Sequence, residues 1–256
     1  HSEARVPLPL PCFSDPCGDD EHQGHQKGAM QSTSTHLLRN LFPPTTLGQK
    51  YVIQQKLGEG TYGEVYRGTT KTSDRFGERA VVALKRIKSL KELAGFPVTS
   101  VREVIALRHL RDTLGSAQKR YFVLLRECVL SDDCDSVYLV FDYVPHSLAG
   151  LCMRRLPFDE QDISLIFLQI LRGLCILHKA DVMHRDLKLD NILVDQQGNV
   201  MLCDFGLSVP MGSDRKNLTP RLINLVYRPP EMLLGSRAYT KSVDVWSVGF
   251  MLAQML

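Results

Sequence analysis

The stretch from His184 to Gly206 constrains the fold more than any other part of the chain, and it reads HRDLKLDNILVDQQGNVMLCDFG. A carboxylate, an ammonium and an amide stand close together at its start, at Asp186, Lys188 and Asn191. Two short apolar runs separated by a polar turn follow, and they lead to a second carboxylate, Asp204. The stretch therefore predicts two short strands that carry charged and amide side chains at their outer ends.

The turn between the apolar runs favours a hairpin, because Gly198 and Asn199 tolerate positive φ. A hairpin returns both ends of the stretch to one edge, so that Asp186, Asn191 and Asp204 can converge. Asn191 and Asp204 offer hard oxygen ligands, which Mg²⁺ binds together with phosphate oxygens. Asp186 is left to orient a hydroxyl nucleophile and to accept its proton.

The pattern H-R-D-L-K-x-x-N followed by D-F-G resembles the catalytic and metal-binding loops of eukaryotic protein kinases. The alternative, a polar loop between ordinary strands, is disfavoured because the two motifs occur together at this spacing. The resemblance implies an α+β, two-lobe kinase fold with a strand-rich N-lobe and a helical C-lobe that is incomplete at Leu256. It also implies that Asp186 and Lys188 are catalytic, and that Asn191 and Asp204 hold Mg²⁺.

Composition sets broad limits on the class of protein. With 44% hydrophobic and 23% charged residues, the chain has the balance of a globular protein. A net charge of +3 is too small to argue for nucleic acid or an anionic membrane, so we expect neither as a direct partner. Seven cysteines at irregular spacings fit a reducing compartment, and we expect an intracellular location, in the nucleus, the cytoplasm or both.

Three regions are expected along the chain. Residues 1–49 are rich in Pro, Gly, Ser and Thr without an apolar period, and they predict a flexible extension. Two cysteines and two histidines in this segment match no standard zinc-finger spacing. Residues 50–144 are expected to form the N-lobe with the hinge, and residues 145–256 part of the C-lobe. The first residues lack the features of a signal peptide, and a start at His1 rather than Met allows the interpretation of a fragment.

A glycine-rich segment, GEGTYG, lies between two strand-like runs, Tyr51–Leu57 and Glu64–Thr69. Its glycines also fit a dinucleotide-binding fingerprint, but there the last glycine opens a helix. Here Gly63 is followed by β-type residues, which favours a strand–loop–strand flap over phosphates. Without side chains at the glycines, backbone N–H groups can approach a nucleotide closely.

A lysine inside a predicted strand, Lys85 in AVVALKRI, resembles the kinase lysine that holds the α- and β-phosphates. A lone lysine on a strand is usually a solvated edge charge. The helix predicted from about Thr99 to Leu110 supplies a carboxylate partner, Glu103, beside a broad apolar face. The resemblance implies a Lys85–Glu103 ion pair.

The residues GFPVTSVRE, from Gly95 to Glu103, are similar to the PSTAIRE-type signature of cyclin-dependent kinases, especially its P-I-T-A-x-R-E variants. In that family a cyclin pushes this helix inward and closes the ion pair. The resemblance therefore implies a cyclin partner.

The run VYLVFDYVPHSLAGL is similar to the kinase hinge, with Phe141 as the bulky gatekeeper and Asp142 to Val144 beside adenine. Ser147 replaces an acidic residue that commonly contacts the ribose side. The resemblance implies that the residues contacting ATP are Leu57, Gly58, Glu59, Gly60, Thr61, Tyr62, Gly63, Val65, Ala83, Lys85, Phe141, Asp142, Val144 and Leu193.

Further elements are predicted from local patterns. Residues 111–120 predict a polar loop, and residues 121–130 and 136–142 predict two strands. Asp159 is expected to cap a helix through 163–180, which is apolar nearly all round and therefore central to the helical lobe.

The segment from Leu207 to Glu231 has the length and ending of a kinase activation segment. By position, Thr219 is the activating phosphosite, and Thr61 and Tyr62 are the inhibitory phosphosites of the family. Arg102 and Arg185 lie where the family places two of the arginines that bind the activating phosphate.

Three residues in this segment depart from the family pattern. Val209 replaces the third phosphate-binding arginine, Asn224 replaces a threonine that bridges the catalytic Asp and Lys, and Val226 replaces a tryptophan. Arg228 and the preceding loop resemble the substrate pocket that prefers proline after the target residue.

The sequence thus resembles a serine/threonine kinase of the cyclin-dependent group, nearer its transcription-associated branch. The expected activity is proline-directed and cyclin-activated transfer of the ATP γ-phosphate to protein Ser or Thr. The alternative is a catalytically impaired, cyclin-binding pseudokinase or scaffold, which the altered activation segment and the absent C-lobe helices would favour.

Overall fold

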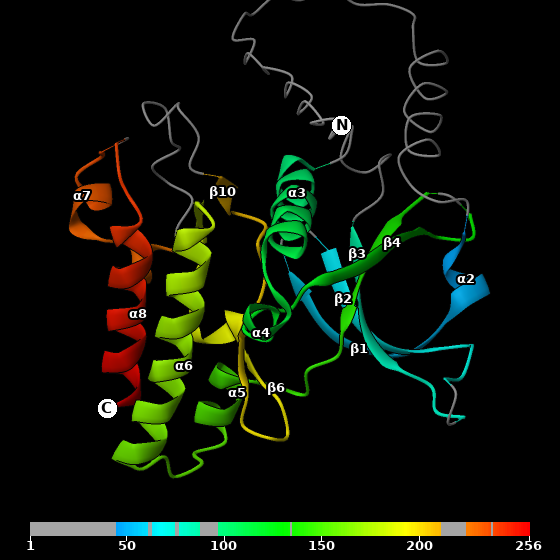
Figure 1. The fold of residues 1–256 in the computed structure, drawn as a ribbon, viewed down its shortest axis with the longest axis horizontal. Coiled ribbons are helices and arrows are strands. Elements are labelled where there is room, and N and C mark those ends of the chain that lie inside the picture. The colour runs from blue at the N-terminus through cyan, green and yellow to red at the C-terminus, as the bar shows by residue number, and fades with distance from the viewer. Residues whose placement is uncertain are drawn as a thin grey trace, which may run out of the picture.

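The structure is a computed structural model that describes residues 45–60, 63–74, 77–87, 97–133, 135–210, 224–236 and 238–256. A strand-rich lobe and a helical lobe lie side by side, with helix α3 next to the sheet and helices α6 and α8 together in the other lobe (Figure 1). The predicted α+β, two-lobe architecture is confirmed.

The small lobe is built on one antiparallel sheet with the strand order β1-β2-β3-β5-β4. Its outer face packs an apolar cluster that includes Val82, Leu84 and Tyr138. Because side chains alternate along a strand, Ala83 and Lys85 lie on the opposite, inner face. The strands span Tyr51–Gly60 (β1), Gly63–Thr70 (β2), Val81–Ile87 (β3), Leu125–Leu130 (β4) and Val137–Asp142 (β5).

Residues 45–50, most of them in the predicted extension, adjoin this sheet. Thr46 forms a bridge with Leu130 of β4, and the short helix α2 (Leu47–Lys50) leads into β1. Glu127 on β4 accepts from both Lys50 and Tyr51, with the Lys50 Nζ and the Tyr51 hydroxyl each 2.6 Å from a carboxylate oxygen. This contact ties the start of β1 to β4.

Helix α3 (Val98–Thr113) confirms the predicted helix and extends it by one turn. The prediction of a polar loop over residues 111–120 is wrong, because α3 continues to Thr113 and helix α4 (Ser116–Lys119) follows. The Gln118 side chain accepts from the Gly115 N–H, which supports the first turn of α4. Leu114 between the helices is buried, so the connection is anchored in the core.

The large lobe is organised around helix α6 (Glu160–Lys179), which packs against helix α8 (Ser242–Met255). As predicted, the Asp159 side chain caps α6 by accepting from the Asp162 N–H. The smaller elements are α5 (Leu148–Met153), α7 (Pro230–Leu233), β6 (His146–Ser147), β7 (Val182–Met183), β8 (Ile192–Val194), β9 (Val200–Leu202), β10 (Val209–Pro210) and two 3₁₀ turns, η1 (Leu189–Asn191) and η3 (Leu225–Tyr227).

Helix α6 buries one face rather than its whole circumference. Its buried positions follow helical spacing, whereas Leu165, Leu168 and Leu171 are exposed. In length and hydropathy α6 resembles a membrane span, and it is the single such helix in the described part of the chain. Core helices share these properties, and the contacts of α6 with α8, β7 and β9 are those of a core helix.

The predicted hairpin is formed by β8 and β9, which pair from Ile192–Leu202 to Val194–Val200. Gly198 has φ of +80°, as the turn chemistry suggests, whereas Asn199 does not adopt positive φ. Instead, Asn199 donates from its backbone N–H and its side-chain amide to Asp195. The turn therefore uses one left-handed residue and one carboxylate.

We predict that Asp159→Ala lowers the free energy of unfolding by about 1 kcal/mol, because the first turn of α6 loses its side-chain cap. Urea denaturation followed by circular dichroism measures the change. Glu160→Ala is the matched control, since it removes a neighbouring carboxylate from the same turn without removing the cap. Equal losses in the two variants would contradict a specific capping role.

Candidate active site

Three elements meet at an ion pair beneath the sheet. Lys85 on β3 places its Nζ 2.9 and 2.8 Å from the two carboxylate oxygens of Glu103 on α3. The same ammonium lies 2.9 Å from Oδ1 of Asp204, which follows β9. The sequence predicted each of these residues for the site, and the structure brings all three together.

Burial and charge set the protonation states in this cluster. Burial opposes the charged ammonium, but Glu103 and Asp204 outweigh that effect and hold the pKa of Lys85 above its ordinary value. Burial also acts against the Asp204 carboxylate, but Lys85 keeps the pKa of Asp204 below its ordinary value. Glu103 is only 2% exposed, and burial raises its pKa while Lys85 offsets part of the rise. The cluster therefore holds an ammonium next to an ionised aspartate.

The catalytic-loop residues also lie together. Lys188 Nζ is 3.1 Å from Asp186 Oδ2, and the amide nitrogen of Asn191 donates to the same oxygen at 2.9 Å. The Asn191 amide donates as well to the backbone carbonyl of Asp186 at 2.8 Å. These bonds fix the Asp186 carboxylate in one orientation, as a group that must align a hydroxyl requires.

Asn191 and Asp204 fit the Mg²⁺ site that the sequence predicts. The Asn191 amide nitrogen is engaged with Asp186, and its Oδ1 accepts no hydrogen bond from any residue that the structure describes. Asp204 Oδ2 is equally unengaged by the described residues, since Lys85 contacts Oδ1. Within the described ranges no group of three or more His, Cys, Asp and Glu side chains forms a metal cluster. Two hard oxygens that leave room for phosphate oxygens suit Mg²⁺.

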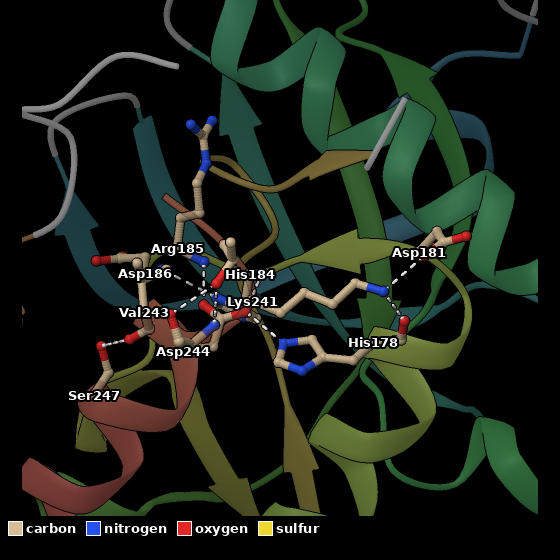
Figure 2. Close-up of polar contacts among 11 residues, drawn as sticks. His178, Asp181, His184, Arg185, Asp186, Lys241, Val243, Asp244 and Ser247 are labelled. Atoms are coloured by element: carbon tan, nitrogen blue, oxygen red, sulfur yellow. Dashed lines mark hydrogen bonds and ion pairs between the residues drawn. The ribbon is translucent and has the colours of Figure 1, made fainter. Parts of the chain in front are cut away.

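Asp244 on helix α8 binds the backbone of the catalytic loop. The buried Asp244 carboxylate accepts the backbone N–H groups of His184 and Arg185 at 2.9 and 2.8 Å, and the His178 ring at 2.8 Å (Figure 2). Arg185 has φ of +66°, a left-handed conformation that costs energy for an arginine. The Asp244 bonds stabilise the loop in this conformation.

His184 joins the catalytic loop to the metal-binding loop. Its Nε2 lies 3.0 Å from the carbonyl oxygen of Cys203, and its ring packs against Phe205 with a centroid distance of 4.8 Å. Asp204, between these two residues, has φ of +62°. The contacts on both sides of Asp204 therefore constrain the direction of its carboxylate.

Most of the residues predicted to contact a nucleotide lie on the small-lobe sheet or the hinge, and Leu193 lies on β8 of the large lobe. Val65 on β2 pairs with Lys85, and Ala83 pairs with the buried Phe141. Asp142 at the end of β5 is held by Arg126, at 2.7 Å from Nε to Oδ1. At the glycine-rich segment Leu57 and Glu59 are exposed, and Gly58, Gly60 and Gly63 belong to strands β1 and β2. The other described positions, Val144 and Leu193, are half-buried. Thr61 and Tyr62 lie outside the described residues.

Ser147, which stands where the family has an acidic residue, caps a helix. Its hydroxyl accepts from the Gly150 N–H at 3.1 Å at the start of α5. The serine thus retains the capping role while offering a nucleotide only a hydroxyl in place of a carboxylate.

The two arginines predicted to bind phosphate differ in their contacts with the described residues. Arg185 donates from Nε to the Leu207 carbonyl at 2.7 Å and from Nη1 to the Tyr239 hydroxyl at 2.9 Å. Arg102 on α3 forms no ion pair with any described residue. The predicted phosphosite, Thr219, lies outside the described residues.

The substrate side of the site differs from the family pattern in one contact. The Asn224 side chain accepts from the Val226 N–H at 3.3 Å, and no hydrogen bond joins it to Asp186 or Lys188. Arg228 follows η3 and is half-buried, at the position predicted for the proline-preferring pocket.

Sequence reasoning missed several contacts that support the site. Tyr239 was not predicted to contact Arg185, and the Arg126–Asp142 pair was not predicted at the hinge. The second could have been inferred, because the two residues carry opposite charge on neighbouring predicted strands. No local pattern marks Tyr239, which is 54 residues from its partner.

The chain is similar to known proteins over the residues that form the two lobes. The protein kinase domain family matches residues 51–256. Cyclin-dependent kinase 10 of Rattus norvegicus is 40% identical over 202 residues, which cover 78% of this chain and 53% of the relative. Cyclin-dependent kinase 11B of Homo sapiens is 39% identical over 209 residues, or 81% of this chain and 25% of the relative. Cyclin-dependent kinase G-2 of Oryza sativa subsp. indica is 40% identical over 202 residues, or 78% and 27%.

The chain thus spans about half the length of one of these curated relatives and about a quarter of the other two. The family match covers every element of the sheet, the catalytic loop and helix α8. The chain therefore belongs to the protein kinase family, in its cyclin-dependent kinase group.

Proposed function

We propose that the chain transfers the γ-phosphate of ATP to Ser or Thr hydroxyls of proteins. The observation that carries this proposal is the closed contact of Lys85 with Glu103 and Asp204. It places an ammonium for the nucleotide phosphates next to a carboxylate for the accompanying cation. Positioning and charge neutralisation of this kind supply most of the catalysis in phosphoryl transfer.

The residues divide the work by their positions. The acceptor hydroxyl donates to the Asp186 carboxylate, which orients it and takes its proton as the new P–O bond forms. At the same time the bond from the γ-phosphorus to the β,γ-bridging oxygen breaks, and ADP leaves. Lys188, 3.1 Å from Asp186, neutralises charge on the transferring phosphoryl group. Bound Mg²⁺, held by Asn191 and Asp204, would neutralise charge on the phosphate oxygens.

The acceptor is proposed to be a Ser or Thr followed by proline. Support comes from Arg228, which follows the 3₁₀ turn η3 at the position where the family resemblance implies the substrate pocket. The preceding residues Leu225 and Val226 are exposed, so the loop offers an apolar surface to a substrate residue. A proline ring, which lacks an N–H donor, suits such a surface.

A cyclin is the proposed activating partner, and it would contact the outer face of α3. Val101 and Ile105 form an exposed apolar stripe on α3, one helical turn apart and next to the exposed Arg108. Glu103 and Leu107 are buried on the other side of the helix. An apolar stripe on the solvent face of a helix is typical of an interaction site. Since the Lys85–Glu103 pair is already closed in the single chain, the cyclin would stabilise this position of α3.

Phosphorylation is proposed as a further control. Thr219, if phosphorylated, would present an anion to Arg102 and Arg185, and phosphates on Thr61 or Tyr62 would repel those of ATP. Val209 carries no charge, so two arginines rather than three would bind the activating phosphate.

An intracellular location, in the nucleus or the cytoplasm, is proposed on redox grounds. Cys128, Cys152, Cys175 and Cys203 are all free thiols in the described part of the chain. Unpaired cysteines of this number fit a reducing compartment.

A catalytically impaired, cyclin-binding scaffold is the second candidate function, and Asn224 favours it. The side chain of Asn224 bonds to Val226 instead of bridging Asp186 and Lys188. The intact contacts of Asp186 with Lys188 and Asn191 favour catalysis over this alternative.

We predict that Asp186→Asn lowers kcat by about 10²- to 10⁴-fold, because the amide cannot accept the hydroxyl proton. The measurement is phosphate transfer from ATP to a Ser-Pro peptide in the presence of cyclin. Asp190→Asn is the matched control, since it makes the same change at an exposed position four residues away.

The same assay with a second peptide tests the proline preference. A Ser-Ala peptide should be phosphorylated less efficiently by the unmodified chain than the Ser-Pro peptide. Equal kcat for the unmodified chain and Asp186→Asn would reject the catalytic assignment and leave the scaffold as the better hypothesis.

Lys85→Met is expected to lower kcat/KM by at least about 10²-fold, because the nucleotide phosphates lose their ammonium and Asp204 loses its partner. Steady-state kinetics with varied ATP measures the change, with circular dichroism as a check on folding. Lys50→Met is the control. Lys50, like Lys85, pairs with a glutamate, but its partner Glu127 lies on the edge strand β4 of the sheet. Unchanged turnover in Lys85→Met would show that the role of Lys85 is wrong.

A third substitution addresses the cyclin. Ile105→Glu should weaken cyclin binding by about tenfold or more, because a charge enters the apolar stripe on α3. Ile105 is 47% exposed, so the fold is retained. Ile53→Glu is the control, as Ile53 is 40% exposed on β1 of the same lobe.

Binding to a panel of purified cyclins is measured by biolayer interferometry. Loss of binding in both variants would point to a general effect of the charge, and retained binding in Ile105→Glu would place the cyclin elsewhere.

A further inference from the structure

A line of polar side chains crosses the outer face of the small-lobe sheet. It consists of Lys56 on β1, Glu64 on β2, Arg86 on β3 and Ser136 just before β5, and we call it the outer ladder. Lys56 Nζ lies 2.6 Å from Glu64 Oε1, and Arg86 Nη1 lies 3.2 Å from Glu64 Oε2. Arg86 then donates to the buried Ser136 hydroxyl from Nε and Nη2, each at 3.3 Å.

Glu64 is the centre of the ladder. Besides Lys56 and Arg86, it accepts from the Tyr66 hydroxyl at 2.8 Å, and Tyr66 packs against the apolar cluster on this face. The hydrogen bonds from Lys56 and Tyr66 lower the pKa of Glu64 to about 2, so it is ionised at neutral pH. Lys56 also pairs with Glu59 in the glycine-rich segment at 2.7 Å. Glu64 therefore links the glycine-rich segment and strand β1, through Lys56, to strand β3, through Arg86.

The ladder lies directly behind the nucleotide-facing residues. In the β2–β3 register Glu64 pairs with Arg86, and the adjacent pair is Val65 with Lys85. Consecutive side chains in a strand point to opposite faces, so the two pairs share one stretch of backbone. Moving β2 relative to β3 at Glu64 would move Val65 relative to Lys85 by the same displacement.

We propose that Glu64 is a positioning residue for ATP, which fixes the glycine-rich hairpin β1–β2 over the nucleotide by tying it to β3 and β5 from the outer face. This inference rests on the nucleotide site proposed above and adds a residue that does not touch the nucleotide. Its effect is expected on the affinity for ATP, because in the nucleotide site proposed above the hairpin lies over the phosphates and adenine, whereas Asp186 and Lys188 belong to the large lobe.

The chain offers a matched comparison within the same sheet. Glu127 on β4 also accepts from a lysine and a tyrosine, Lys50 and Tyr51, each at 2.6 Å. That cluster joins the beginning of β1 to β4 and does not include β3. If an ion pair on the sheet acted only through general stability, the two glutamates would behave alike.

The test compares Glu64→Gln with Glu127→Gln in the full chain. Calorimetry measures the Kd for MgATP, kinetics measure KM for ATP and kcat with a Ser-Pro peptide, and thermal unfolding measures stability. Glu64→Gln should raise both Kd and KM for ATP about threefold to fivefold, with kcat unchanged. Glu127→Gln should leave Kd and KM at the unmodified values.

A second substitution tests the coupling. Lys56→Met alone should raise the Kd for MgATP, and adding it to Glu64→Gln should raise it by less than the product of the separate effects. Independent effects of the two changes would overturn the ladder as one unit.

The outcomes separate this inference from the proposed function. If the unmodified chain binds MgATP and Glu64→Gln binds it equally well, the positioning role is overturned and the nucleotide site stands. If both glutamine variants weaken ATP binding together with thermal stability, the effect is structural and the positioning role is again overturned. An unmodified chain that binds no MgATP would overturn both proposals.

Discussion

The contact of Lys85 with Glu103 and Asp204 fixes three distant parts of the chain relative to one another. Glu103 is almost fully buried, and removing one partner of a buried charge pair typically costs about 3 to 5 kcal/mol. The position of helix α3 and the direction of the Asp204 carboxylate therefore depend on the same ammonium. A partner that shifts α3 would therefore shift Glu103 relative to Lys85. The contact thus links the exposed face of α3 to the position of Lys85 and Asp204.

The large lobe supplies a rigid base for that contact. Asp244 accepts the backbone N–H groups of His184 and Arg185 (Figure 2). The His184 ring in turn lies within hydrogen-bond distance of the Cys203 carbonyl oxygen. Two residues along this path, Arg185 and Asp204, have positive φ. Strained conformations persist only where the surroundings determine them, and the α8 carboxylate provides that constraint.

Local patterns predicted most of the fold and the residues of the site. Strand-like runs of β-type residues predicted the strands of the sheet, and the Asp159 cap predicted where α6 begins. Helix α4 was missed because its polar sequence carries no apolar period, and it is stabilised by a cap at Gly115 and the buried Leu114. The outer ladder and the Arg185–Tyr239 bond were missed because their partners are far apart in the sequence.

The departure from the family pattern at Asn224 leaves the contacts on the nucleotide side of the site unchanged. On the nucleotide side Lys85 has both of its carboxylate partners, and Asp186 is held by Lys188 and Asn191. On the substrate side Asn224 is turned to its own 3₁₀ turn. Among the described residues Asn224 forms no hydrogen bond with Asp186 or Lys188, so in the proposed reaction its substitution affects how the acceptor is held, while the groups around Lys85 keep their contacts. For the proposed kinase activity, the altered segment therefore bears on substrate choice and activation more than on the transfer of phosphate.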